Sequence, residues 1–250
     1  MPVRLHITAE GQTEERFVKD VLAPYLGEQG VWADARCVLT SKNKRAGAEY
    51  RGGFRRHSAY LTVKADICAW MKEDRHPDVR FTTMFDLYAL PTDFPGHAAA
   101  AAEQKPYEKV RLLEESLCQD IRGELDDTRF IPYIQLHEFE ALLFADPQRL
   151  DWEFLEHAAP IQRLVAMVAA EGGNPELIDD GDTTAPSKRI AAEIPEYAGS
   201  KATSGPLVAG KIGMNVLRNK CRHFREWLDM LIALGAASRV QGGNGSGVHG

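Results

Sequence analysis

The sequence predicts an α/β fold: a mainly parallel sheet flanked by helices, with a helical subdomain after it. Apolar runs with strand character occur at residues 3–9, 31–39, 79–90 and 130–136. Stretches with apolar residues at helical spacing separate these runs, which is typical of βαβ units and of a parallel sheet. After residue 147 the strand signal fades, and the remaining patterns are helical.

The first strand, at residues 3–9, is followed by an expected helix at residues 14–26. Thr13 can act as its N-cap, and Glu14 would lie at the positive end of the helix dipole. The second strand leads into a basic segment, residues 41–56, which we interpret as a loop. Further helices are expected at residues 57–73, 98–103, 107–125 and 138–144.

The chain divides by pattern into three parts. Residues 1–147 are expected to form the α/β core, and residues 148–238 a helical cap over the carboxyl edge of its sheet. The helical patterns of the cap are at residues 160–170, 209–219 and 222–234. Residues 239–250 are rich in glycine and polar residues, so a disordered tail is expected.

Composition is that of a globular protein, with 44% hydrophobic and 26% charged residues in 250. The N-terminal residues have no signal-peptide pattern and no apolar run is long enough for a membrane span, so a cytoplasmic protein is expected. The cysteines lack metal-ligand spacing and are interpreted as reduced thiols. Phosphate-binding loops of ATPases, dinucleotide fingerprints and the serine-hydrolase elbow are absent from the sequence.

Acidic residues follow three of the expected strands. Glu10 and Glu14 come after the first, Asp86 after the third, and Glu138 and Glu140 after the last. In an open α/β sheet, ligands bind beyond the carboxyl ends of the strands, where these carboxylates can converge on one divalent cation. The alternative for Glu14 is a helix-dipole role, and for Glu10 an exposed strand end.

The segment around Glu138 does not reveal how its acids divide their roles. On an α-helix, Glu138 and Glu140 would point about 200° apart, so only one is expected to face the site. His137 beside them is either a structural hydrogen-bonding group or a base.

Basic residues are unevenly distributed in a chain of net charge −6. In residues 41–56 they are interleaved with glycines, Tyr50 and Phe54, so this segment is either a phosphate-binding loop or a solvated connection. The glycines explain flexibility but not the positive sign of the charge. The segment APSKRI would place Lys188 in the first turn of a helix, as a clamp on a phosphate. The candidate nucleic-acid contacts are Lys42, Lys44, Arg45, Arg51, Arg55, Arg56, Lys188, Arg189 and Lys211.

A strand followed by the motif EGQTE and a helix resembles the first motif of Toprim-fold proteins. Their second motif, D-x-D, corresponds to Asp86-Leu87-Tyr88, where Tyr88 replaces the second aspartate. Together EGQTEERF, MFDLYALPTDFPG, YIQLHEFEALLFADP and APSKRI resemble an uncharacterised bacterial Toprim-like family. That family is related to the overcoming-lysogenization-defect (OLD) nucleases and is often encoded beside an SMC/ABC-type ATPase in mobile or defence loci.

The resemblance implies a Mg²⁺- or Mn²⁺-dependent nuclease on DNA or RNA that works with such an ATPase in bacterial defence against mobile elements. The expected metal ligands are Glu10, Glu14, Asp86, Glu138 and Glu140. The expected catalytic residues are Glu10, Asp86, His137, Glu138, Glu140 and Lys188. Two alternatives stay open: an inactive docking or regulatory module of the ATPase, and a metal-dependent nucleotide phosphotransferase. The sequence does not decide whether the chain forms a homo-oligomer.

Overall fold

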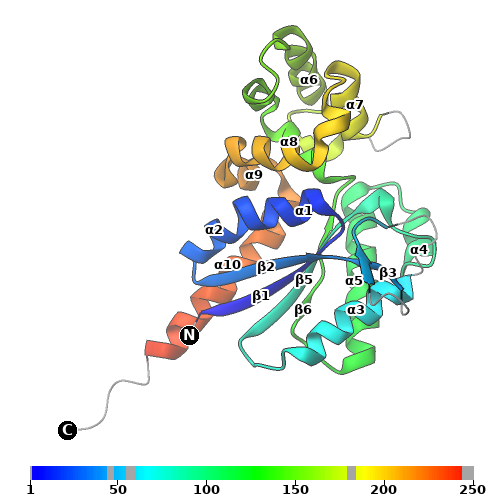
Figure 1. Cartoon of the computed structure of the whole chain (residues 1–250), viewed down its shortest axis with the longest axis vertical. Helices are drawn as coiled ribbons and strands as arrows, with labels where there is room; N and C mark the ends of the chain where they lie inside the picture. Colours follow the sequence, from blue (N-terminus) through cyan, green and yellow to red (C-terminus); the bar gives the residue numbers. More distant parts are fainter. Residues whose placement is uncertain (1, 44–47, 55–59, 179–183, 244–250) are drawn as a thin grey trace.

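The computed structural model describes residues 2–43, 48–54, 60–178 and 184–243 (Figure 1). Its main sheet has the strand order β2-β1-β5-β6, and all of these strands pair in parallel. The strands are β1 (Val3–Ala9), β2 (Val31–Cys37), β5 (Val79–Asp86) and β6 (Phe130–Ile131), and β7 (Ile134–Gln135) also pairs with β5. The predicted α/β class with a mainly parallel sheet is confirmed.

The predicted strand at residues 130–136 is split into β6 and β7. Pro132 lies between them and has no backbone N–H with which to continue the ladder. The side chain of Thr83 bridges the gap: its Oγ1 accepts from the Tyr133 N–H at 2.9 Å and donates to the Tyr133 carbonyl at 2.8 Å. Both short strands therefore stay beside β5.

Helices cover both faces of the sheet. On one face α1 (Gln12–Phe17), a π-helical stretch η1 (Val18–Leu22), α2 (Ala23–Glu28) and α10 (Arg222–Gly243) share a hydrophobic cluster with Leu5 and Ile7. On the other face α3 (Tyr60–Glu73) and α5 (Pro106–Leu125) pack on Val79, Phe81 and Phe85. The short helix α4 (His97–Ala101) packs against α5.

The first helix differs from the prediction at its start. Gly11, not Thr13, is the N-cap residue, and the carboxylate of Glu14 accepts the Gly11 N–H at 2.8 Å. The helix begins earlier than expected because Glu14, in the third helical position, satisfies this otherwise unpaired N–H group.

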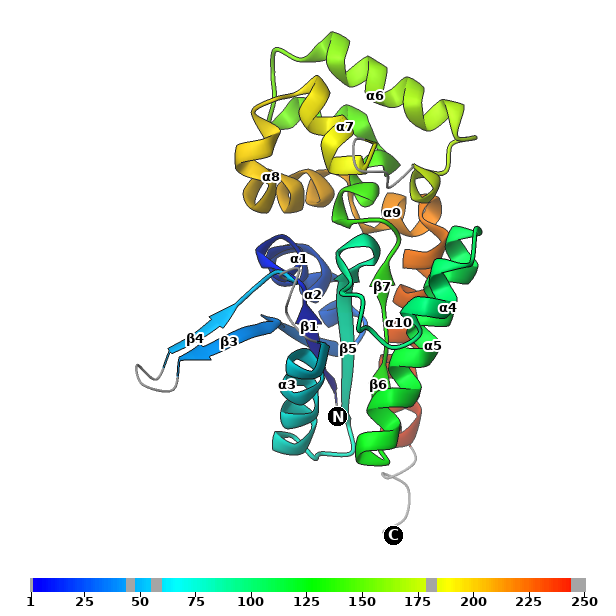
Figure 2. The same ribbon diagram turned by 90° about the vertical axis from the view of Figure 1, so that its right-hand side faces the viewer.

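The expectation of a loop in the basic segment is wrong. It contains an antiparallel hairpin of β3 (Leu39–Asn43) and β4 (Ala48–Arg51), which projects from the body of the protein (Figure 2). Pairing between main-chain groups forms these strands, so the apolar alternation that would have signalled them is not needed.

The second half of the described chain is helical apart from its connections. In chain order it comprises the 3₁₀ helices η3 (Phe139–Ala145) and η4 (Pro147–Trp152), the α-helix α6 (Ala158–Ala170), the 3₁₀ helix η5 (Pro175–Leu177), and the α-helices α7 (Pro186–Glu193), α8 (Tyr197–Ile212), α9 (Met214–Lys220) and α10. Gly213, with φ +84°, separates α8 from α9 inside the single helix expected at residues 209–219. Helices α6 to α9 lie beyond the carboxyl edge of the sheet (Figure 1).

The last helix returns to the sheet. The indole N–H of Trp227 on α10 donates to Oγ1 of Thr82 on β5 at 3.0 Å. α10 extends to Gly243, inside the segment expected to be a disordered tail, and residues 244–250 lie outside the described residues. The division of the chain at residue 147 stays a prediction.

Two further features accord with the composition. Cys37, Cys68, Cys118 and Cys221 are free. Every helix in the described ranges is too short or too polar to span a lipid bilayer.

Candidate functional site

The carboxyl ends of β1 and β5 bring Glu10 and Asp86 into contact. The two strands pair up to Ala9 and Met84, and the Glu10 N–H continues the ladder by donating to the Met84 carbonyl at 2.9 Å. The side chain of Glu10 then accepts the backbone N–H of Asp86 at 2.8 Å. The two acids that the sequence places after separate strands are therefore neighbours.

Glu14, Glu138 and Glu140 complete an acidic cluster with Glu10 and Asp86. Glu14, on α1, is 5% exposed, and Glu138 and Glu140 are 2% and 4% exposed. Glu10 and Asp86 are half-buried. Glu138 and Glu140 contact residues of α7 and α8.

Both glutamates of the segment after β7 lie near the other acids of this cluster, and the expectation that only one of them faces a bound ligand stays a prediction. Each interacts electrostatically with Asp86, and Glu140 also with Glu138. The α-helical geometry behind the expectation does not apply, because Glu138 is the extended N-cap residue of η3, which is a 3₁₀ helix.

Each of these buried carboxylates meets a donor from the protein. Glu138 accepts hydrogen bonds from the hydroxyl of Tyr88 and from the backbone N–H of Ser187. Glu140 accepts one from the Tyr197 hydroxyl at 3.0 Å and lies 3.7 Å from the ammonium of Lys201.

Burial and mutual repulsion make these acids hard to ionise. Burial, and then the charges of Glu14 and Glu138, raise the pKa of Glu10 to about 8, although the backbone N–H of Asp86 opposes the shift. Burial and the charge of Glu138 raise the pKa of Glu140 to about 7, against the opposing charge of Lys201. The pKa of Asp86 is raised well above its ordinary value by burial and by the neighbouring glutamates, and burial raises that of Glu14.

The donor set fits a hard divalent cation by chemical type. All of these ligands are carboxylate oxygens, which suit Mg²⁺, Mn²⁺ and Ca²⁺. Oδ1 of Asp86 is enclosed and accepts no hydrogen bond. Within the described ranges, however, no three His, Cys, Asp or Glu side chains are arranged to hold a metal ion as they stand. Cation binding would therefore require some carboxylates to turn from the donors that they now contact.

His137 is part of the turn that leads into this segment. Its backbone is left-handed, with φ +63°, and its Nε2 lies 3.0 Å from the carbonyl oxygen of Glu176. This contact fastens the ring to the η5 segment, which accords with the structural alternative for His137.

The predicted phosphate-binding residues whose side chains the structure describes lie on three elements, β4, α7 and α8. Lys188 is exposed on α7, Arg189 donates to the Thr184 carbonyl at 2.6 Å, and the ammonium of Lys211 lies 4.4 Å from the ring centre of Trp152. Arg51 is ion-paired with Asp66. The side chains of Lys42, Lys44, Arg45, Arg55 and Arg56 lie outside the described residues.

Tyr88, Ser187, Tyr197 and Lys201 contact the cluster in ways that sequence reasoning missed. In the sequence, Tyr88 stands out only because it replaces the second aspartate of D-x-D. A hydroxyl at that position can donate a hydrogen bond to a neighbouring carboxylate, as Tyr88 does to Glu138. Tyr197 follows Glu140 by 57 positions, and nothing in the local sequence around it indicates this contact.

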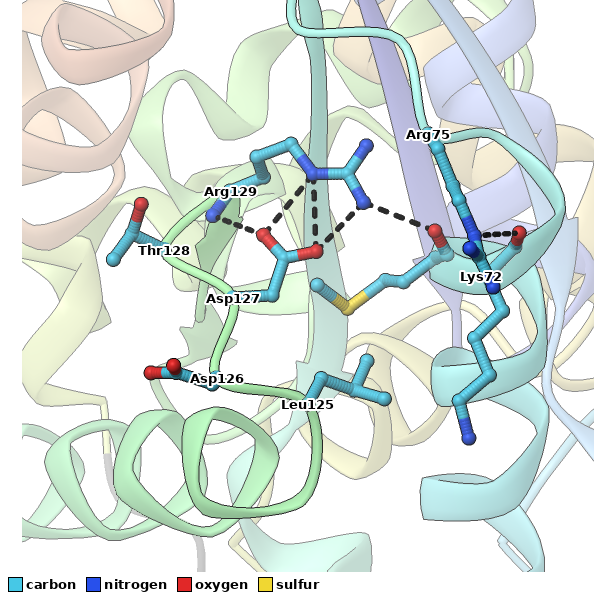
Figure 3. Close-up of a pocket in the computed structure, with 8 residues that line it drawn as sticks. Lys72, Arg75, Leu125, Asp126, Asp127, Thr128 and Arg129 are labelled. Carbon is cyan, nitrogen blue, oxygen red and sulfur yellow. Dashed lines mark hydrogen bonds and ion pairs between the residues drawn. The ribbon is translucent and has the colours of Figure 1, made fainter.

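A separate cavity of about 510 Å³ lies at the opposite, amino edge of the sheet (Figure 3). Figure 3 shows Arg129 paired with Asp127 on one wall, with Lys72 and Arg75 across from them. None of the residues lining it is a predicted site residue, so it lies apart from the acidic cluster.

Comparison with known proteins assigns the chain to a family. A family model described as "Domain of unknown function (DUF4276)" matches residues 9–232, so the chain belongs to that family. No curated protein matches it. Among solved structures, it is similar to the C-terminal region of the Burkholderia pseudomallei OLD protein, with 12% sequence identity and a TM-score of 0.41. That similarity covers 94% of this chain and all of the other.

Proposed function

We propose that this protein is a metal-dependent phosphodiesterase that cleaves nucleic acid at the acidic cluster. The observation that carries the proposal is the contact between Glu10 and Asp86, at the strand ends where α/β proteins bind ligands. Burial and the neighbouring acids raise the pKa values of Glu10 and Asp86, so ionising these side chains together costs free energy. A divalent cation would remove that cost, and such pKa shifts are typical of functional sites.

When bound, a Mg²⁺ or Mn²⁺ ion would neutralise the phosphate and lower the pKa of an attacking water. Glu10 and Asp86 would hold it at the ends of β1 and β5, with Glu14 as a third ligand. Glu138 and Glu140 would support it from beneath, once released from Tyr88 or Tyr197. The hairpin, Lys188 and Arg189 are the proposed contacts to nucleic-acid phosphates.

The main alternative is a docking module without catalysis, and one observation favours it. The buried carboxylates are occupied by protein donors, and the described residues contain no ready-made metal ligand set. An SMC/ABC-type ATPase is the proposed partner under either function, through the resemblance of the sequence motifs.

The test measures cleavage and metal uptake together. With Mn²⁺, the wild-type protein is expected to nick plasmid DNA or cut RNA, and to bind Mn²⁺ in isothermal titration. Glu10→Gln and Asp86→Asn should abolish both, because each removes one negative ligand without changing side-chain size. Glu15→Gln is the matched control, because Glu15 is on the same helix but pairs with Lys19 at 2.9 Å.

Equal cleavage by the wild type and both variants would mean a contaminating nuclease and would end the enzymatic proposal. Lack of Mn²⁺ binding by the wild type would favour the docking module.

A further inference from the structure

Asp66, on α3, lies under the base of the β3–β4 hairpin. Its side chain is 6% exposed and joins two arginines from different strands. Arg51, the last residue of β4, donates to Oδ2 at 3.0 Å and to Oδ1 at 3.3 Å. Arg36, on β2, donates to Oδ1 at 3.2 Å. Two hydrogen bonds between one guanidinium and one carboxylate fix the orientation of the Arg51 side chain as well as its distance from Asp66.

The residues that follow Arg51 lie on the turn that carries Glu10. The Gly53 N–H donates to the Glu10 carbonyl at 2.7 Å, and the backbone of Phe54 acts to lower the pKa of the Glu10 carboxyl against the effect of burial. Gly52 has φ +107° and Gly53 has φ +71°, conformations that favour glycine. A Cβ atom added to Gly52 would stand 4.0 Å from the Cα of Gly11, so the two turns are in contact.

The ring of Phe54 secures the same connection from the side of β5. It packs edge-on against Phe85, the residue before Asp86, with ring centres 5.0 Å apart. The chain of contacts from Asp66 through Arg51 to Phe54 therefore reaches Glu10 and Asp86 at the ends of β1 and β5.

We propose that Asp66 is a positioning residue that holds the β3–β4 hairpin, through Arg51, against the turn of Glu10. It thereby links the hairpin that would grip nucleic acid to the carboxylate that would bind the cation. The inference rests on the proposed function. It adds a structural connection through which the binding of nucleic acid and the binding of the cation affect each other. Because such coupling is reciprocal, nucleic acid bound at the hairpin would tighten cation binding, and the cation would tighten nucleic-acid binding.

The test compares Mn²⁺ affinity in variants of the full chain by isothermal titration. Asp66→Asn keeps the shape of the side chain but removes the charge that orients Arg51. Its dissociation constant for Mn²⁺ is expected to rise about tenfold, as when residues supporting metal ligands are changed. Arg51→Gln should have a similar effect, and the double variant should be no worse than either single variant.

Asp120→Asn is the matched control. Asp120, on α5, accepts hydrogen bonds from Tyr60 at 2.7 Å and Lys64 at 3.1 Å, both on α3. This variant loosens the same helix without contact to Arg51. It is expected to lower the thermal midpoint but to leave the dissociation constant for Mn²⁺ unchanged.

Wild-type affinity in Asp66→Asn, or equal weakening in Asp120→Asn, would overturn the positioning role and leave the proposed function standing. Additive losses in the double variant would also overturn it, because Asp66 would then act independently of Arg51. If the wild type itself binds no Mn²⁺, the proposed function fails and this inference fails with it.

Discussion

Lys201 supplies a positive charge at the deep side of the acidic cluster. Its ammonium is 3.7 Å from Glu140, and its charge lowers the pKa of both Glu140 and Glu14 against the larger effect of burial. The side chain is 37% exposed, so solvent screens part of this attraction. Lys201 therefore offsets only part of the repulsion among the carboxylates.

Replacing Lys201 should make Glu140 harder to ionise. In Lys201→Met the pKa of Glu140 is expected to rise above its wild-type value of about 7, because the opposing positive charge is lost. Carboxyl chemical shifts followed through a pH titration measure this directly. Lys211→Met, on the same helix, is the control, because Lys211 lies against Trp152. If Glu140 titrates at the same pH in Lys201→Met as in the wild type, Lys201 does not lower the pKa of Glu140.

At the scale of elements, the close approach of α10 to the turn between α2 and β2 depends on Gly235. A Cβ atom placed there would stand 2.1 Å from the carbonyl oxygen of Gln29 and 3.1 Å from Cγ2 of Val31. The backbone of α10 therefore touches this turn directly, and the first contact leaves no room for a methyl group.

Gly235→Ala is accordingly expected to destabilise the protein by about 1–3 kcal/mol, the usual cost of overpacking. Gly123→Ala on α5 should instead stabilise by about 0.5–1 kcal/mol, because alanine favours helix and nothing lies within 4 Å of the new atom. Urea unfolding of both variants gives the two free energies. A neutral Gly235→Ala would mean that α10 is not seated as closely as described.

At the scale of the whole molecule, the raised pKa values predict a dependence of stability on pH. Between 4.5, the ordinary pKa of a glutamate, and about 8, Glu10 holds more protons in the folded than in the unfolded protein. The free energy of unfolding therefore falls as pH rises through this window. Glu140 acts in the same direction up to about 7. His6 and His223 have raised pKa values too, so their contribution is present below 6.5 and is also lost as pH rises.

Without divalent ions, the thermal midpoint is expected to decrease from pH 4.5 to pH 8, the ordinary and shifted pKa of Glu10. Mn²⁺ should raise the thermal midpoint more at pH 8 than at pH 4.5, because at pH 8 the carboxylates can ionise around the cation. Glu10→Gln isolates the share of Glu10: the decrease should become smaller, the parts due to Glu140 and the histidines should remain, and the response to Mn²⁺ should be lost. Scanning calorimetry measures the thermal midpoint at each pH. If it falls with pH equally in Glu10→Gln and the wild type, Glu10 does not contribute to the pH dependence of stability.

The sequence by itself determined the positions of the strands in the main sheet and the α/β class, but not the β3–β4 hairpin. Leu5 and Ile7 on β1, and Phe81 and Phe85 on β5, are buried in hydrophobic clusters that helices cover. Long apolar runs separated by helices leave few alternatives to a parallel sheet. The meeting of Glu10 with Asp86 could be predicted for the same reason, since parallel strands end at the same edge.

Only the tertiary structure decided which groups each acid meets. Ser187, Tyr197 and Lys201 reach Glu138 and Glu140 through the packing of α7 and α8 over the sheet edge. The hairpin, too, is held by pairing between strands and by the contact from Arg51 to Asp66. Such contacts depend on how distant surfaces fit together, whereas periodicity in a sequence reports only on neighbours along the chain.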